Sequence, residues 1–326
     1  MDQQTKAEVA RDVFPFIQVL KDGTIRRLVG TEVTPAGFDT ETGVLSKDVV
    51  IIRKTGVKAR LYRPTSCTNK LPLVVYFHGG GFFTSTIAEP KYHDSLNKIV
   101  AEANILLVSI DYRLAPENPL PVAYEDSWAA LQWVASHVDG EGGGENWIND
   151  YADLGKLFLA GDSAGANISH HLGLKIKGSD LDAKLKIRGI IMIHPYFWGQ
   201  VPIGKEATDH FRKSMVDNWW SLVCPSEKEN DDPLINPFVD GSPSLAGLAC
   251  DRVLLFVAEN DILRDRGWLY YEKLKKSGWE GKVEIVETEG VDHVFHILDP
   301  SCEKVETLFK GLSSFINHGK APVAVV

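Results

Sequence analysis

Cysteine is scarce in this chain of 326 residues, which contains only Cys67, Cys224, Cys250 and Cys302. They are scattered, with no CxxC pair and no spacing typical of a zinc site. The set is also too sparse for the disulfide framework of a small secreted domain. We therefore expect four free thiols in a reducing compartment, with no metal and no cofactor.

Long apolar runs are missing as well. No stretch approaches the roughly 20 apolar residues that a membrane-spanning helix needs. The first ten residues are mixed polar and charged, without the apolar core of a signal peptide. These features predict a cytoplasmic protein that does not interact with membranes.

An excess of positive charge is also absent. The chain has 44 acidic residues against 35 lysines and arginines, for a net charge of −9. That balance argues against nucleic acid as a partner and favours a small molecule. The remaining composition is ordinary for a globular protein, at 44% apolar and 24% charged residues. It does not distinguish a monomer from a homodimer.

Apolar runs rich in β-branched and aromatic residues alternate with helical patterns along the chain. Such runs are typical of strands that are buried on both faces of a sheet. The alternation predicts a mainly parallel sheet with helices on both faces, that is, an α/β fold in a single domain. The expected strands are 47–53, 59–62, 73–77, 105–110, 157–160, 187–193, 253–257 and 283–287. The expected helices are 92–102, 124–137, 164–176, 264–277 and 303–316, with a glycine-rich loop at 140–144.

Two segments depart from this alternation. Residues 1–45 read as irregular, and 198–237 are too many for a plain loop between two strands. The second segment contains Trp219 and Trp220 among many charged residues. We expect it to be a helical insertion that folds over the carboxyl edge of the sheet. Together with residues 1–45 it would form a cap.

The strongest local signal is Gly161-Asp162-Ser163-Ala164-Gly165, between an expected strand and an expected helix. A G-x-S-x-G motif in that context is typical of the nucleophile elbow of α/β-hydrolases. The sharp turn needs glycines where a Cβ would clash, and it raises the serine hydroxyl above the sheet. We therefore take Ser163 as the candidate nucleophile.

A second glycine-rich motif, His78-Gly79-Gly80-Gly81-Phe82, follows the strand expected at 73–77. Ester hydrolysis builds negative charge on the carbonyl oxygen, and fixed backbone N–H groups stabilise it. Glycines let the main chain approach a substrate closely. The block Gly79, Gly80 and Gly81, together with the amide of Ala164, is the candidate oxyanion hole.

A nucleophilic serine needs a histidine base, which follows it in the chain order of this fold. His293 lies in a loop after the last expected strand and before the last helix. His296 is the alternative, one turn further on. An acid should orient the base, and Asp261 lies in the loop after the strand at 253–257.

Other carboxylates near Asp261 are alternatives. Glu259 lies two residues before it, while Asp265 should already be inside the next helix. Asp292, beside the candidate base, reads as a solvated loop charge. Among the aromatic residues, Phe82, Phe83, Trp198 and Trp219 are candidates for an apolar substrate pocket, although packing between cap and core would explain each of them equally well.

Taken together, the motifs resemble those of the plant carboxylesterases in the hormone-sensitive-lipase-like branch of α/β-hydrolases. The resemblance covers roughly residues 10–318. The matching blocks are 76–82 (YFHGGGF), 111–117 (DYRLAPE), 121–126 (PVAYED) and 161–165 (GDSAG). It implies a cap over the site and small acyl esters as substrates, without a cofactor. It also implies that the blocks at 111–117 and 121–126 brace the core and the glycine block.

The same family contains proteins that do not hydrolyse esters. Gibberellin receptors lack the triad histidine, whereas this chain has His293. The 2-hydroxyisoflavanone dehydratases often carry threonine in place of the nucleophile, and this chain resembles them at 197–199 and 246–250. Ser163 favours the esterase, with a dehydratase-like lyase as the alternative. A protein that only binds a small ligand is the third hypothesis.

Overall fold

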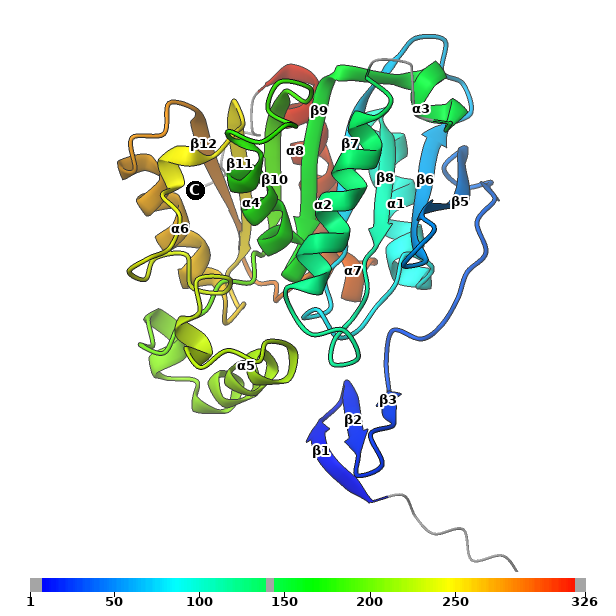
Figure 1. Cartoon of the computed structure of the whole chain (residues 1–326). Coiled ribbons are helices and arrows are strands. Elements are labelled where there is room, and N and C mark those ends of the chain that lie inside the picture. The colour runs from blue at the N-terminus through cyan, green and yellow to red at the C-terminus, as the bar shows by residue number, and fades with distance from the viewer. Residues whose placement is uncertain (1–7, 139–143, 320–326) are drawn as a thin grey trace, which may run out of the picture.

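The computed structural model describes residues 8–138 and 144–319 (Figure 1). Apart from Gly144, the predicted loop at 140–144 lies outside the described residues. Within those ranges nine strands form one sheet, in the order β12 (Lys282–Thr288), β11 (Arg252–Ala258), β10 (Ile187–Ile193), β9 (Ala152–Asp162), β7 (Leu71–Phe77), β8 (Leu106–Asp111), β6 (Val57–Pro64), β5 (Val44–Ile52) and β4 (Phe38–Asp39).

Strands β7 to β12 pair in parallel, whereas β6, β5 and β4 continue the sheet with antiparallel pairing. The predicted mainly parallel sheet is therefore confirmed. The strands predicted at 47–53 and 59–62 read as short edge strands, but the corresponding β5 and β6 are flanked on both sides. The observed edges are β4 and β12.

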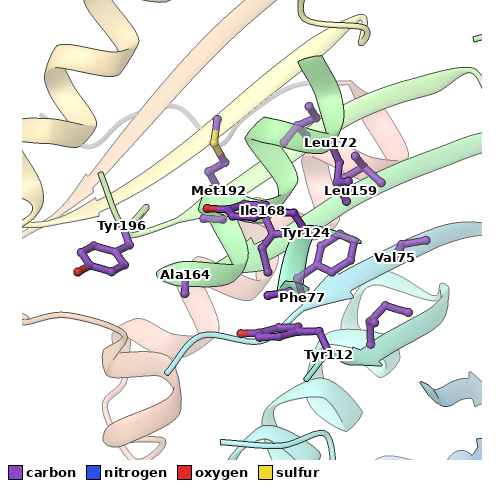
Figure 2. Packing of buried hydrophobic residues seen from close by; sticks show 14 of the residues in the cluster. Val75, Phe77, Tyr112, Tyr124, Leu159, Ala164, Ile168, Leu172, Met192 and Tyr196 are labelled. Atoms are coloured by element: carbon purple, nitrogen blue, oxygen red, sulfur yellow. The ribbon is translucent and has the colours of Figure 1, made fainter. Parts of the chain in front are cut away.

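Helices cover both faces of the sheet. Helices α1 (Pro90–Ala103) and α8 (Lys304–His318) pack on one face, and α2 (Val122–Ala135), α4 (Ala164–Ile176) and α6 (Arg264–Lys276) on the other. Strand β7 shows why its sequence is continuously apolar: Val75 and Phe77 belong to one core, while Val74 and Tyr76 belong to the other. Figure 2 shows side chains from β7, β9, β10 and α4 packed together, among them Val75, Leu159, Ile168 and Met192.

Three differences from the sequence-based elements concern short segments. Strand β9 begins five residues earlier than expected, at Ala152. Two short helices, α3 (Asn146–Tyr151) and α7 (Phe295–Leu298), were not predicted because neither is long enough for a helical periodicity to appear. Among the described residues, no helix is both long and apolar enough to cross a bilayer. The four cysteines are unpaired.

The prediction that residues 1–45 are irregular was wrong for Val9 to Arg27, and the first seven residues lie outside the described ranges. Strands β1 (Val9–Val13), β2 (Ile17–Leu20) and β3 (Ile25–Arg27) form a small antiparallel sheet. The strands have five, four and three residues, which is too short for an alternating pattern to be visible in the sequence. This sheet lies beyond the carboxyl ends of the parallel strands (Figure 1).

The insertion at 198–237 contains the long helix α5 (His210–Val223), which lies at the same end of the molecule as β1–β3 (Figure 1). Asp209 caps the start of this helix, since its carboxylate accepts the amide N–H of Arg212 at 2.9 Å. Arg11 of β1 joins the two parts, since its guanidinium donates to the carbonyl oxygens of Asn218 at 2.6 Å and Ser221 at 3.1 Å.

A buried ion pair anchors the insertion to the sheet domain. The guanidinium of Arg266, in α6, donates to both carboxylate oxygens of Glu206, each at 2.7 Å. The two side chains are only 4% and 0% exposed. A second guanidinium bond reaches the carbonyl oxygen of Val201 at 2.7 Å. The insertion is thus fixed at its start, upstream of α5.

We expect Glu206→Ala to lower the free energy of unfolding by about 3–5 kcal/mol, because it leaves the guanidinium of Arg266 buried without its partner. Urea denaturation followed by circular dichroism measures this difference. Glu306→Ala is the control, since it removes an acid from an exposed i,i+4 pair with Lys310 and should change little. Equal stability of the two variants would contradict an anchoring role for Glu206.

Candidate active site

Ser163 lies at the sharp turn between β9 and α4. Its φ of 51° and ψ of −115° are unfavourable for a residue with a side chain, and such backbone strain gathers at functional sites. Two glycines make the turn possible. A Cβ on Gly165 would lie 1.8 Å from the carbonyl oxygen of Phe77, and one on Gly161 would lie 2.4 Å from the carbonyl carbon of Gly165.

The loops after β11 and β12 bring an acid and a histidine to this serine. The Nε2 atom of His293 lies 2.9 Å from Oγ of Ser163, and its Nδ1 atom lies 2.7 Å from Oδ2 of Asp261. Asp261 is 1% exposed, and its other oxygen accepts the amide N–H of Leu263 at 2.8 Å. The three residues proposed from the sequence therefore form one hydrogen-bonded series.

Backbone contacts fix the orientation of His293. Its own N–H donates to Oδ1 of Asp292 at 2.7 Å, and the next N–H, of Val294, donates to Nδ1 of His194 at 2.8 Å. Val294 has a left-handed backbone, with φ 44° and ψ 38°. No role for His194 was predicted, although this residue directly follows β10 and so lies at the same edge of the sheet.

Burial and charge act on the base in opposite directions. Burial alone would lower the pKa of His293, but the charge and hydrogen bond of Asp261 outweigh it, so the pKa of His293 is raised above its ordinary value. Asp162 and Asp292 act in the same sense as Asp261. Because a base must be unprotonated to accept a proton, this shift sets the acidic limit of any reaction that uses His293.

The alternative residues occupy other positions. His296 is fully buried, neither ring nitrogen has a partner among the described residues, and burial lowers its pKa to about 3. Glu259 accepts the amide N–H of Gly290 at 2.7 Å, and Asp265 accepts that of Lys205 at 2.9 Å. Asp292 is not the freely solvated charge we expected, because it is paired with Arg212 at 2.6 Å.

The glycine block divides into two functions. The amide N–H of Gly79 donates to Oη of Tyr92 at 2.9 Å and to Oδ1 of Asp162 at 3.1 Å, so it is not available to a substrate. Gly80 and Gly81 have φ values of 91° and 61°, which favour glycine. Within residues 8–138 and 144–319 the amides of Gly80 and Gly81 have no acceptor.

The amide of Ala164 lies at the start of α4, where the first N–H groups of a helix have no partner inside the helix. The positive end of the helix dipole adds to their attraction for negative charge. Together with Gly80 and Gly81, Ala164 thus gives the site three backbone donors without an acceptor among the described residues.

Asp162 braces the glycine block against the elbow. Besides the N–H of Gly79, its carboxylate accepts the hydroxyls of Tyr76 at 2.7 Å and Tyr92 at 2.8 Å. It is fully buried, and burial raises its pKa to about 6 even though these hydrogen bonds oppose the shift. In the sequence, Asp162 stands only at a variable position of the G-x-S-x-G motif, and no pattern indicates this bracing role.

Two further contacts hold the glycine block from outside. The hydroxyl of Tyr112 donates to the carbonyl oxygen of His78 at 2.7 Å, with the two rings stacked. Arg27, in β3, donates to the carbonyl oxygens of Phe83 at 2.8 Å and Ala115 at 2.9 Å. The 111–117 block therefore does contact the glycine block, but Arg27 could not be found without knowing that β3 lies beside it.

A cavity of about 230 Å³ opens at the serine. Its wall contains the aromatic rings of Phe16, Phe83 and Trp219, with Phe16 and Trp219 in edge-to-face contact at 5.5 Å between centroids. Ser85, Glu89, Lys91 and Tyr92 add polar groups to the lining. Two of the four predicted pocket residues, Phe83 and Trp219, are thus in the wall.

The other two predicted pocket residues do not line this cavity. Phe82 is fully buried and packs against the rings of Tyr124 and Trp220. Trp198 is fully buried as well, and its indole N–H donates to Asp217 at 2.8 Å. Both aromatic side chains therefore pack in the interior, which is the alternative to a pocket role that the sequence left open.

His194, Asp261 and His293 have potential metal-ligating atoms that all lie within 4.8 Å of one another. Hydrogen bonds already engage this group: Asp261 binds His293, and Nδ1 of His194 accepts a backbone N–H. These bonds account for the cluster as an acid–base arrangement.

A family model described as "alpha/beta hydrolase fold" matches residues 74–297. The chain belongs to this family. It is 57% identical over 321 residues to "Probable carboxylesterase 2" of Arabidopsis thaliana, covering 98% of this chain and 100% of that protein. It is 41% identical to a 2-hydroxyisoflavanone dehydratase of Glycyrrhiza echinata, covering 96% and 97% of the two chains.

The solved structure of a thermostable carboxylesterase cloned from a metagenomic library superposes on this α/β-hydrolase with a TM-score of 0.70 at 28% identity. The match covers 90% of this chain and 92% of that one. An esterase of Pyrobaculum calidifontis gives a TM-score of 0.69, also at 28% identity, with 83% and 84% covered.

Proposed function

We propose that this protein is a carboxylesterase that hydrolyses short-chain or aromatic esters, with Ser163 as nucleophile, His293 as base and Asp261 as orienting acid. The observation that carries the proposal is the series of hydrogen bonds from Asp261 through His293 to Ser163, at 2.7 and 2.9 Å. The cavity beside it has room for a small ester. Its four free thiols support a reducing compartment, and we propose the cytoplasm.

The proposed reaction has two halves. In the first, Nε2 of His293 takes the hydroxyl proton of Ser163 while Oγ attacks the ester carbonyl carbon. The same nitrogen then gives that proton to the leaving alcohol, and an acyl-enzyme remains. In the second half His293 takes a proton from a water molecule, whose oxygen attacks the acyl carbon. His293 then returns the proton to Oγ of Ser163, which releases the free acid. Asp261 stabilises the imidazolium in both halves.

Negative charge develops on the carbonyl oxygen at each attack. We assign its stabilisation to the amides of Gly80, Gly81 and Ala164, each worth roughly 3–4 kcal/mol in such sites. Gly79 belongs to the same motif but acts on the loop itself, because its N–H is held by Tyr92 and Asp162. We also propose that β1–β3 and α5 act as the cap, since Phe16 and Trp219 wall the cavity.

The test is turnover of p-nitrophenyl acetate and butyrate, together with labelling by an organophosphate and identification of the labelled peptide. We expect turnover of both esters and a label on Ser163. If the protein is instead a dehydratase, we expect no ester turnover. It should then convert a hydroxylated isoflavanone, and the Ser163→Thr variant should keep that activity. A protein that only binds a ligand would give neither reaction.

Trp219→Ala should shift the preference toward longer acyl chains, because the indole ring closes one side of the cavity. Accommodating two more methylenes is worth about 1.6 kcal/mol, so the ratio of kcat/KM for hexanoate to that for butyrate should rise about fifteenfold. The p-nitrophenyl ester series measures it. Trp128→Ala, on the half-buried face of α2, should leave the ratio unchanged, and an unchanged ratio in Trp219→Ala would remove Trp219 from the acyl site.

A further inference from the structure

Arg212, in the first turn of α5, contacts both loops that carry the proposed acid and base. Its guanidinium donates to the two carboxylate oxygens of Asp292, at 2.6 and 3.2 Å. It also donates to the carbonyl oxygen of Asn260 at 2.8 Å. Asn260 precedes Asp261, and Asp292 precedes His293. One side chain of the insertion therefore bridges the residues next to both members of the pair.

We propose that Arg212 is a positioning residue that holds the acid loop and the base loop together and compensates the charge of Asp292 beside His293. This inference rests on the proposed hydrolytic function. Arg212 can hold both loops because its forked guanidinium group binds a carboxylate through two hydrogen bonds and still reaches a third acceptor. The bridge closes through Oδ1 of Asp292, which accepts the N–H of His293 at 2.7 Å.

The electrostatic part follows from the sign of each charge around the imidazole. Asp261, Asp292 and Asp162 raise the pKa of His293, whereas Arg212 holds its positive charge against one of them. Removing Arg212 leaves Asp292 uncompensated and should raise that pKa further. The other titratable groups that face His293 or share its cavity stay the same in every variant: His194 after β10, His296 in α7, and Glu89, Lys91 and Tyr92 in the cavity wall.

The bridge also connects the base to the substrate wall. Trp219 lies seven residues after Arg212 on the same helix, a spacing that places both on one face. This face meets the cavity at Trp219 and the two loops at Arg212. A shift of α5 that moves the substrate wall therefore also moves the loops that hold the acid and the base.

The experiment measures kcat and the pH profile of kcat/KM for p-nitrophenyl acetate in five variants. Arg212→Ala should lower kcat roughly 10–100-fold through misplacement of the loops. It should also move the acidic limb of the profile, where activity falls as His293 becomes protonated, to a pH that is higher by about half a unit. Arg212→Lys keeps the charge but loses the fork, so kcat should fall without a shift of the limb. Asp292→Asn should move the limb down, and Arg212→Ala combined with Asp292→Asn should return it toward wild type.

Arg188→Ala is the matched control. Arg188 pairs with Asp251 at side-chain exposures of 40% and 46%, close to the 41% and 46% of Arg212 and Asp292. It lies near the amino-terminal end of β10, away from the site, so neither kcat nor the limb should change. Thermal unfolding of all variants separates a general loss of stability from these effects.

A titration of the His293 ring by NMR repeats the charge comparison without substrate. An imidazole pKa that is the same in wild type and Arg212→Ala, with kcat also unchanged, would overturn the inference. Absence of ester turnover in the wild type, with the ring titration still shifting as described, would instead overturn the proposed function and leave the electrostatic role of Arg212 standing.

Discussion

Ser163→Ala should lower kcat for p-nitrophenyl butyrate by about 10⁶, down to the residual rate supplied by binding and the backbone donors. The hydroxyl that His293 approaches at 2.9 Å is the atom that would form the acyl bond, and alanine has nothing to replace it. His293→Ala should cost about as much. Because the two residues act in the same step, the double variant should be no slower than either single variant.

Stopped-flow and long-incubation assays of the purified variants measure this loss. Ser109→Ala is the control, since Ser109 is a fully buried serine in β8 whose hydroxyl has no partner in the described structure. It should keep wild-type turnover. Measurable ester turnover within tenfold of wild type in Ser163→Ala would show that another group is the nucleophile.

The elbow and the glycine block could be predicted because their chemistry is local. At Gly161 and Gly165 a Cβ would lie less than three ångströms from a backbone atom, so only glycine fits. The G-x-S-x-G pattern between an expected strand and an expected helix indicates this turn. The base and the acid could be ordered along the chain because parallel strands end at one edge of the sheet. Asp261 and His293 lie in the loops that follow two such strands, β11 and β12.

The residues that the sequence did not reveal act across long distances in the chain. Arg27 meets the carbonyl oxygen of Phe83 from a sheet that was not predicted, and Arg212 meets Asp292 from an inserted helix. In the sequence each resembles any other surface arginine, and no spacing predicts its hydrogen-bond partner. Asp162 is different, because its role depends on the burial of two tyrosine hydroxyls that no local pattern specifies.

The residues that line the cavity were only partly predictable for a similar reason. Phe82 and Phe83 are neighbours in the sequence, yet Phe82 has φ 70° and turns into the core, whereas Phe83 faces the cavity. Aromatic residues of cap and core look alike in a sequence because both bury apolar area. Only the direction of the chain after Gly81 separates the wall of the cavity from its support.

Asp261→Asn should lower kcat by about 10⁴, because the amide holds the imidazole in the wrong tautomer. Asp261 accepts from Nδ1 of His293 at 2.7 Å, which leaves Nε2 unprotonated and directed at Ser163. The NH₂ group of asparagine would donate to Nδ1 and move the ring proton to Nε2. Nε2, which faces Ser163, then has no lone pair to accept the serine proton, and the imidazolium loses its buried counter-charge.

The pH profile of Asp261→Asn tests the same contact independently. The charge of Asp261 raises the pKa of His293, so its removal should move the acidic limb of the remaining activity to lower pH. Asp251→Asn, which alters an exposed acid paired with Arg188, should change neither rate nor profile. A limb that stays in place while kcat falls would mean that Asp261 orients the ring without setting its charge. If kcat also stayed at the wild-type level, the acid of the site would have to be sought elsewhere.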